Sequence, residues 1–169
     1  MSADRRPIDA ETRATSDDHH ALRLWLRLYA CTSLVESRVR RRLQTRFSTT
    51  LPRFDLMAQL DRSPQGLRMS ELSSRLMVTG GNVTGLTDNL EDEGLVVRES
   101  DGADRRALRV KLTREGRRVF RAMAAEHERW IADMFAGLSA REARSLAERL
   151  HTLKEHILDK VPLDERETE

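Results

Sequence analysis

The sequence predicts a mainly α-helical protein with one small β-hairpin, and three observations lead to this fold class. Long stretches repeat apolar residues at spacings of three and four, which is the period of an amphipathic helix. Residues 95–112 instead alternate apolar and polar side chains around a turn, which indicates two short antiparallel strands. Aromatic residues make up 4% and charged residues 34% of the chain, which suits long amphipathic helices better than a β-sandwich.

The first predicted element is a long amphipathic helix over residues 17–47. No Gly or Pro interrupts it, and apolar residues recur on one stripe from Leu24 to Leu43. Its first half is apolar around most of its girth, so we expect burial against more than one partner, while its second half is basic. Residues 1–16 are polar, lack the apolar core of a signal peptide and predict a disordered arm.

Residues 48–112 contain the helices of a helix-turn-helix. Pro52 is suited to the first turn of one helix, and Ser70 is the expected N-cap of the next, short helix. Residues 79–81 make a tight turn, because their glycines permit a sharp bend. The helix that follows should end at Gly94, the residue type favoured just beyond a helix C-terminus.

Short strands surround this helix pair. Residues 67–69 could form one strand, residues 95–98 another, and a second alternating run ends at Leu112, after a turn over residues 101–106. A short helix, a tight turn, a second helix and a basic hairpin are the parts of a winged helix-turn-helix. The sequence therefore predicts this fold, flanked by N- and C-terminal helices.

Residues 113–161 return to a helical period. Thr113 is the expected N-cap of a helix that Gly137 interrupts, and residues 139–142 form a capping box that opens a last helix. The flanking helices carry more apolar surface than a small winged unit can cover, so we expect them to form a homodimer. Residues 162–169 form an acidic tail.

The outward face of the helix after residue 81 is small and polar. Thr and Asn side chains can meet base edges, and Gly85 would let the helix approach a groove closely. The alternative is an ordinary solvated face, with Gly85 packed against the preceding helix. Asp88 and residues 91–93 would repel phosphate, so the helix should enter DNA by its N-terminal end, where the dipole favours anions.

The charge pattern and the single cysteine limit the partners and the compartment. Net charge is only +2, yet residues 38–53 and 98–121 are strongly basic, which indicates a local surface for a polyanion.

Cys31 excludes a disulfide within the chain and favours a reducing cytoplasm. No apolar run approaches the length of a membrane span, so no membrane partner is expected. We also expect no cofactor, no metal site and no enzymatic activity, because no set of ligands or catalytic groups has the required spacing.

Three segments resemble the MarR-type (multiple antibiotic resistance regulator) winged-helix transcription factors. They are residues 69–72, residues 81–96 and the hairpin, in which Asp104-Arg105-Arg106 is followed by Leu112-Thr113-Arg114-Glu115-Gly116. The resemblance implies a homodimer, with Arg106 in the DNA minor groove and Asp104 orienting it. The chain departs from the family pattern at Asn89, where an Arg is common, and at Asp101-Gly102, where a Pro is common.

The candidate contacts to double-stranded DNA follow from the helix face and from this resemblance. Arg75 and Arg98 are expected at phosphates, while Arg105 and Arg106 could instead form only a solubilising turn. The full set is Thr79, Gly81, Asn82, Thr84, Gly85, Asp88, Asn89, Arg75, Arg98, Asp104, Arg105 and Arg106. A two-fold dimer then predicts a pseudo-palindromic operator with half-sites about 10 bp apart.

A small-molecule effector is expected from the resemblance, because some members of the family sense aromatic acids or their CoA thioesters. The basic run with Arg38, Arg40 and Arg41 could pair with phosphates of such a ligand, or could lie near DNA, or could be a solvated face. A pocket is predicted from five further residues, for which core packing is the alternative: Trp25, Tyr29, Arg53, Phe54 and Met57.

Two other functions remain open. Cys31 falls on the apolar stripe of the first helix, which indicates a buried thiol, but a redox-sensing repressor acting through Cys31 is an alternative. The second alternative is a winged-helix protein-interaction module or antirepressor that no longer binds DNA, which Asn89 would favour.

Overall fold

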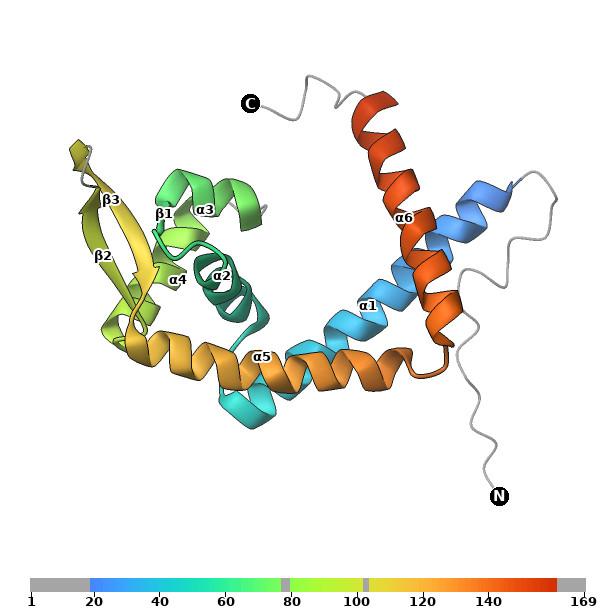
Figure 1. Cartoon of the computed structure of the whole chain (residues 1–169), viewed down its shortest axis with the longest axis horizontal. Helices are drawn as coiled ribbons and strands as arrows, with labels where there is room; N and C mark the ends of the chain where they lie inside the picture. Colours follow the sequence, from blue (N-terminus) through green and yellow to red (C-terminus); the bar gives the residue numbers. More distant parts are fainter. Residues whose placement is uncertain (1–18, 77–79, 102–103, 161–169) are drawn as a thin grey trace. The chain divides into compact units, whose positions relative to one another are not determined.

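The computed structural model describes residues 19–76, 80–101 and 104–160, and the chain divides into two compact units, residues 1–128 and 129–169. The elements of the chain are labelled in Figure 1. In order they are α1 (His20–Phe47), α2 (Leu51–Asp61), β1 (Leu67–Arg68), α3 (Met69–Leu76), α4 (Gly80–Asp92), β2 (Val96–Asp101), β3 (Asp104–Leu112), α5 (Arg114–Phe135) and α6 (Ala140–Lys160). The fold is mainly helical with a small sheet, as the hydrophobic periods predict.

The sheet of the first unit has three antiparallel strands in the order β1-β3-β2. Leu67 pairs with Val110, and Val96 pairs with Leu112, so β3 is the central strand. The hairpin strands are longer than the sequence predicts, because β2 continues to Asp101 and β3 begins at Asp104. The turn predicted over residues 101–106 is therefore too long, because the backbone of residues 104–106 belongs to a strand.

The core of the first unit lies among α2, α3, α4 and the sheet. Apolar residues from each of these elements are fully buried, which explains why the short helices are stable without strong propensity. The C-terminal half of α1 and the start of α5 add further buried residues. The core members are Val39, Leu43, Leu56, Met57, Leu60, Leu72, Val83, Leu90, Val110, Phe120 and Met123.

Three helix ends form as predicted, because the groups that cap them are close in sequence. Gly94 has a φ of 70°, and its N–H and that of Leu95 donate to the carbonyls of Glu91 and Leu90, which closes α4. The Thr113 hydroxyl accepts the N–H of Gly116 at 2.9 Å and caps α5. In the capping box before α6, the backbone N–H of Ser139 donates to the Glu142 carboxylate at 2.8 Å.

The predicted N-cap at Ser70 is wrong. Helix α3 begins one residue earlier, at Met69, so Ser70 lies inside its first turn. The carboxylate of Glu71 accepts the backbone N–H of Arg68 at 2.7 Å. A side chain three residues along the helix thus satisfies the first orphan donor, in the way the carboxylate of a capping box does.

Both units expose apolar helix faces. In the first unit, the N-terminal half of α1 leaves large side chains about half exposed: Leu22, Leu24, Trp25, Tyr29 and Leu34. In the second unit, α6 has no buried residue and exposes a stripe at Leu146, Leu150, Leu153 and Ile157. The burial predicted for the first half of α1 is therefore not achieved among the described residues of its unit.

Candidate nucleic-acid interface

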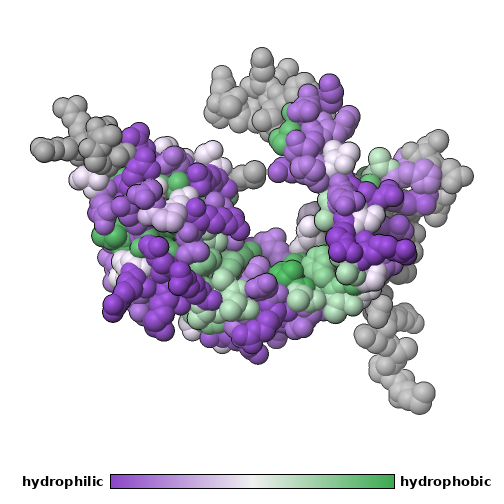
Figure 2. Space-filling view, viewed as in Figure 1, coloured by the Kyte–Doolittle hydropathy of each residue, from purple (hydrophilic) through white to green (hydrophobic). Residues whose placement is uncertain are grey.

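The outer face of α4 is small, polar and exposed. Val83 and Leu90 are fully buried on the inner face, and Leu86 is partly buried, as the helical period predicts. The exposed residues are Asn82, Thr84, Gly85, Asp88 and Asn89. In Figure 2, hydrophilic residues cover most of the winged region in view.

Thr87 is a buried member of α4 that the sequence analysis missed. Its side chain is fully buried, and its hydroxyl donates to the carbonyl of Val83 at 2.8 Å. This bond to the preceding turn lets a threonine enter the core without an unsatisfied polar group. The signal available in the sequence was its position four residues after Val83, on the same face.

Gly85 lies in open space at the middle of this face. A Cβ atom built at Gly85 would meet no other atom within 4 Å. The alternative in which Gly85 allows packing against the preceding helix is therefore wrong. A glycine in a helix interior costs about 1 kcal/mol relative to alanine, and no contact within the described chain offsets this cost.

Arg98 is engaged by carboxylates of α4. Its guanidinium pairs with Asp88 at 2.5 Å and with Glu91, and its backbone N–H donates to Glu91 at 3.0 Å. Burial alone would lower the pKa of Arg98, but the hydrogen bonds that its guanidinium donates to Asp88 and Glu91 outweigh this effect and raise that pKa. The predicted phosphate contact by Arg98 thus competes with two partners inside the chain.

A second ion pair acts at the end of the same helix. Arg53, in α2, pairs with Glu93 just beyond α4, and its side chain is only 19% exposed. Two of the three acidic residues at positions 91–93 therefore have an arginine partner. The repulsion of phosphate that the sequence predicts for this end of the helix is reduced accordingly.

The remaining predicted contacts lie around α4. The Arg75 guanidinium donates to the Ser63 hydroxyl at 3.1 Å and is exposed. Thr79 lies outside the described residues. For Gly81, Asp104, Arg105 and Arg106 the structure describes the backbone alone, in α4 and β3. Their roles in DNA contact stay predictions.

The predicted effector residues are placed in different surroundings. Trp25 and Tyr29 are more than half exposed and stack on each other, with ring centroids 5.6 Å apart. Phe54 is buried against Phe120 and His127, at centroid distances of 5.5 and 5.0 Å, and Met57 is also buried. Core packing, the stated alternative, therefore describes Phe54 and Met57 in the single chain.

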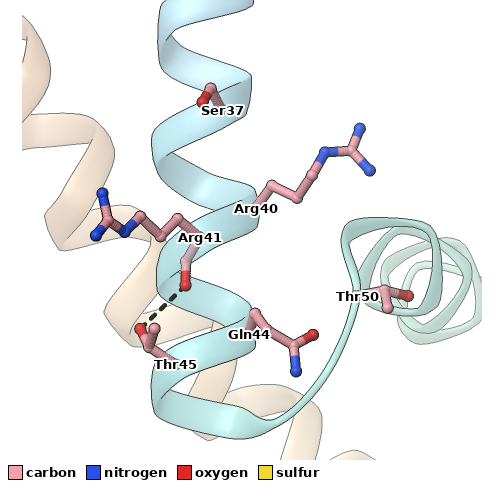
Figure 3. Close-up of a pocket in the computed structure, with 6 residues that line it drawn as sticks. All are labelled: Ser37, Arg40, Arg41, Gln44, Thr45 and Thr50. Atoms are coloured by element: carbon pink, nitrogen blue, oxygen red, sulfur yellow. Dashed lines mark hydrogen bonds between the residues drawn. The ribbon is translucent and has the colours of Figure 1, made fainter.

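An open hollow of about 490 Å³ lies beside the basic half of α1. Its lining consists of Ser37, Arg40, Arg41, Gln44, Thr45 and Thr50. Figure 3 shows Arg40 and Arg41 projecting in different directions from the helix. Arg40 pairs with Glu36, and the Thr45 hydroxyl donates to the carbonyl of Arg41 at 3.0 Å. Arg38 is exposed and does not line this hollow.

A titratable pair connects α2 with α5, which the sequence analysis did not identify. Burial raises the pKa of Asp55, while His127 acts against this shift. Burial also lowers the pKa of His127, and Asp55 opposes that shift. The two residues are far apart in sequence, so only the folded chain brings their charges together.

Cys31 is exposed in the single chain, contrary to the buried thiol that its position on the apolar stripe predicts. The reason is that no element among the described residues of its unit covers the N-terminal half of α1. In the described ranges, no three His, Cys, Asp or Glu side chains are placed to hold a metal ion. None of the helices described there is long and apolar enough to cross a membrane.

The arrangement of α3, α4 and the β2–β3 hairpin defines a winged helix-turn-helix protein with an exposed polar second helix. Comparison with known proteins gives the family. The MarR family model matches residues 47–107. The crystal structure of a MarR family transcriptional regulator from Silicibacter pomeroyi is 34% identical, covers 84% of this chain and 99% of that one, and has a TM-score of 0.70. The chain belongs to the MarR family of transcriptional regulators.

Curated relatives agree with this assignment. The transcriptional activatory protein BadR of Rhodopseudomonas palustris is 30% identical over 126 residues, which are 73% of this chain and 71% of BadR. The HTH-type transcriptional regulator YkoM of Bacillus subtilis is 38% identical over 85 residues, but this match spans only 54% of YkoM and 50% of this chain. Sco3205 of Streptomyces coelicolor, solved in complex with DNA, is 26% identical with a TM-score of 0.72, over 86% of this chain and 91% of its own.

Proposed function

We propose that this chain is a homodimeric repressor that binds a pseudo-palindromic DNA operator and leaves it when a small-molecule effector binds. The observation that carries the proposal is the outer face of α4, which is polar and exposed and has at its centre Gly85, where an added Cβ would meet no neighbouring element of the described residues. Such a face suits close approach to a major groove. The DNA complex of Sco3205, a structure of the same family, supports this assignment.

In this arrangement each subunit would place residues 82–89 in a major groove. Arg106 of the hairpin would enter the adjacent minor groove, where arginine favours narrow, A·T-rich tracts. The positive charge of the hairpin and the N-terminal dipole of α4 would both attract phosphate.

The exposed apolar faces support the dimer. Soluble monomers rarely expose contiguous apolar patches, yet α1 exposes leucine, tryptophan and tyrosine side chains and α6 exposes leucine and isoleucine side chains. A second copy of the chain would cover them in a closed, two-fold assembly. We therefore propose α1, α5 and α6 as dimerisation helices.

The test uses a fluorescent duplex that contains the control region beside the chain's own gene. Arg106→Ala should weaken binding while the dimer persists in light scattering. Arg141→Ala, which removes the same charge from the side of α6 opposite its apolar stripe, serves as the control. Affinity should fall steeply with salt, as counterions are released. Unchanged affinity of Arg106→Ala would refute the role of the hairpin, and a flat salt titration would refute DNA as the partner.

The sign of regulation needs its own measurement. BadR is described as a transcriptional activatory protein, whereas we propose repression for this chain. A promoter–reporter assay in cells with and without the gene decides between them, because loss of a repressor raises the signal and loss of an activator lowers it.

For the effector we propose an aromatic acid or its CoA thioester. The hollow beside α1 supports an anionic ligand, because two arginines, a glutamine and three hydroxyl side chains line it. CouR of Rhodococcus jostii, solved with p-coumaroyl-CoA bound, has the same fold at 20% identity, a likeness that shows the fold alone. Arg41→Ala should weaken release by an aryl-CoA but leave DNA binding intact, whereas Arg38→Ala, outside the hollow, should change neither.

One observation favours a second candidate, a repressor that senses oxidants through Cys31. The thiol is exposed in the single chain, and exposure is one of the conditions for oxidation of a cysteine. Cys31→Ser should lose release by peroxide and keep release by the small molecule if this candidate is correct. The protein-interaction alternative, which Asn89 favours, would be supported if the chain bound no duplex at all.

A further inference from the structure

Arg98 lies where the hairpin meets α4, and three of its polar contacts are to that helix. One guanidinium nitrogen lies 2.5 Å from the Asp88 carboxylate, and the other pairs with Glu91. Its backbone N–H also donates to Glu91, at 3.0 Å. The residue is therefore held to α4 both by its backbone N–H and by its guanidinium group.

The strand geometry explains why this arginine reaches the helix. Val96 and Arg98 are two residues apart on β2 and so point to the same face of the sheet. Across the sheet Arg98 pairs with Val110, which is fully buried, so this face is the one turned toward the core. The Arg98 side chain is only 20% exposed, whereas that of Asp88 is 53% exposed. The cation thus approaches Asp88 from the protein side.

Asp88 lies on the outer face of α4, one turn after Gly85. A carboxylate at this place would repel the phosphates of a bound duplex unless a cation neutralised it. Arg98 supplies that charge without occupying the surface that would contact DNA.

We infer that Arg98 is a positioning residue for DNA recognition: it neutralises Asp88 on the outer face of α4. The inference rests on the proposed function, because it requires α4 to approach DNA. It replaces the simple phosphate contact expected from the sequence.

The experiment measures operator affinity and melting temperature for a set of full-length variants. Arg98→Gln should weaken binding roughly tenfold, since it leaves Asp88 as an unneutralised charge near phosphate. Adding Asp88→Asn to Arg98→Gln should restore most of the affinity, because the repelling charge is gone. Arg144→Gln, which removes one exposed positive charge from the side of α6 opposite its apolar stripe, should bind like the wild type.

Glu91→Gln provides a test that does not depend on the folding of Arg98→Gln. If Arg98 acts by neutralising the charge of Asp88, this variant should bind DNA at least as tightly as the wild type, because Asp88 is then the one carboxylate of the two that still pairs with Arg98. If the contact matters only for the fold, the lost hydrogen bonds should weaken binding instead.

Two results with the Arg98 variants would overturn the inference: wild-type affinity of a folded Arg98→Gln variant, or no recovery in the double variant. Weaker binding by Glu91→Gln would overturn it as well. Failure of the wild-type chain to bind any duplex is a different outcome, because it refutes the proposed function and the inference with it.

Discussion

Replacement of Gly85 by alanine should raise the stability of the chain and lower its affinity for DNA. The new methyl group meets no atom within 4 Å, so the stability gain is that of helix propensity alone, about 1 kcal/mol. For a domain of this size the melting temperature should rise by about 2–4 °C. In the complex the same methyl group would stand between helix and groove. Overpacking of this kind costs about 1–3 kcal/mol, or about 5- to 150-fold in affinity.

The two effects have opposite signs, and this makes the prediction specific. Thermal unfolding gives the first, and a duplex titration with the wild-type operator gives the second. Thr152→Ala is the matched control, since it replaces an exposed residue of α6 by the best helix former, far along the chain from α4. A Gly85→Ala variant that is more stable and binds DNA as well as the wild type would refute close approach at this position.

Two further predictions concern stability. Gly116→Ala should lower the melting temperature by about 6–12 °C, because the new Cβ would lie 1.9 Å from the carbonyl oxygen of Leu95, a clash of about 3 kcal/mol. Gly137→Ala is the control, because a Cβ at Gly137 would meet no atom within 4 Å. Equal melting temperatures of the two variants would contradict the prediction. The second follows from His127, whose pKa in the folded chain is lowered below its ordinary 6.5 by burial. As pH falls below about 6.5, the unfolded chain binds the His127 proton more readily than the folded chain does. The free energy of unfolding should therefore decrease as pH falls from about 6.5 through the lower pKa of the folded chain. His127→Gln should flatten this part of the melting-temperature profile, and an unchanged slope would contradict the assignment.

Features that depend on near neighbours could be predicted from the sequence. The cap at Thr113, the box at residues 139–142 and the left-handed Gly94 are each closed by hydrogen bonds to residues at most five positions away. The buried face of α4 was predicted for the same reason, because a helix fixes the relation between residues three and four apart. The wrong N-cap at Ser70 shows the limit of prediction from local patterns. The Ser70 hydroxyl and the Glu71 carboxylate are neighbours in sequence, and each can cap a helix N-terminus, so the sequence does not decide between them.

Features that depend on packing could not be predicted. The partners Arg53 and Glu93 are 40 residues apart, and no local pattern connects them. Phe54 and Met57 show a related difficulty, because apolar residues that line a pocket and those that fill a core have the same sequence pattern. The burial of Trp25 likewise depends on a partner that covers α1, because this side chain is exposed in the single chain.

The acidic end of α4 shows why a charge count along the sequence differs from the field a ligand meets. Counted in sequence, Asp88 and residues 91–93 place four carboxylates at one end of the helix that would read DNA. In the fold, Arg98 and Arg53 reach three of them from a strand and from another helix. Opposite charges in contact leave a weak residual field at a distance, which salt screens further. The attraction for phosphate should then come from the hairpin, and the neutral residues of α4 should decide which bases are accepted.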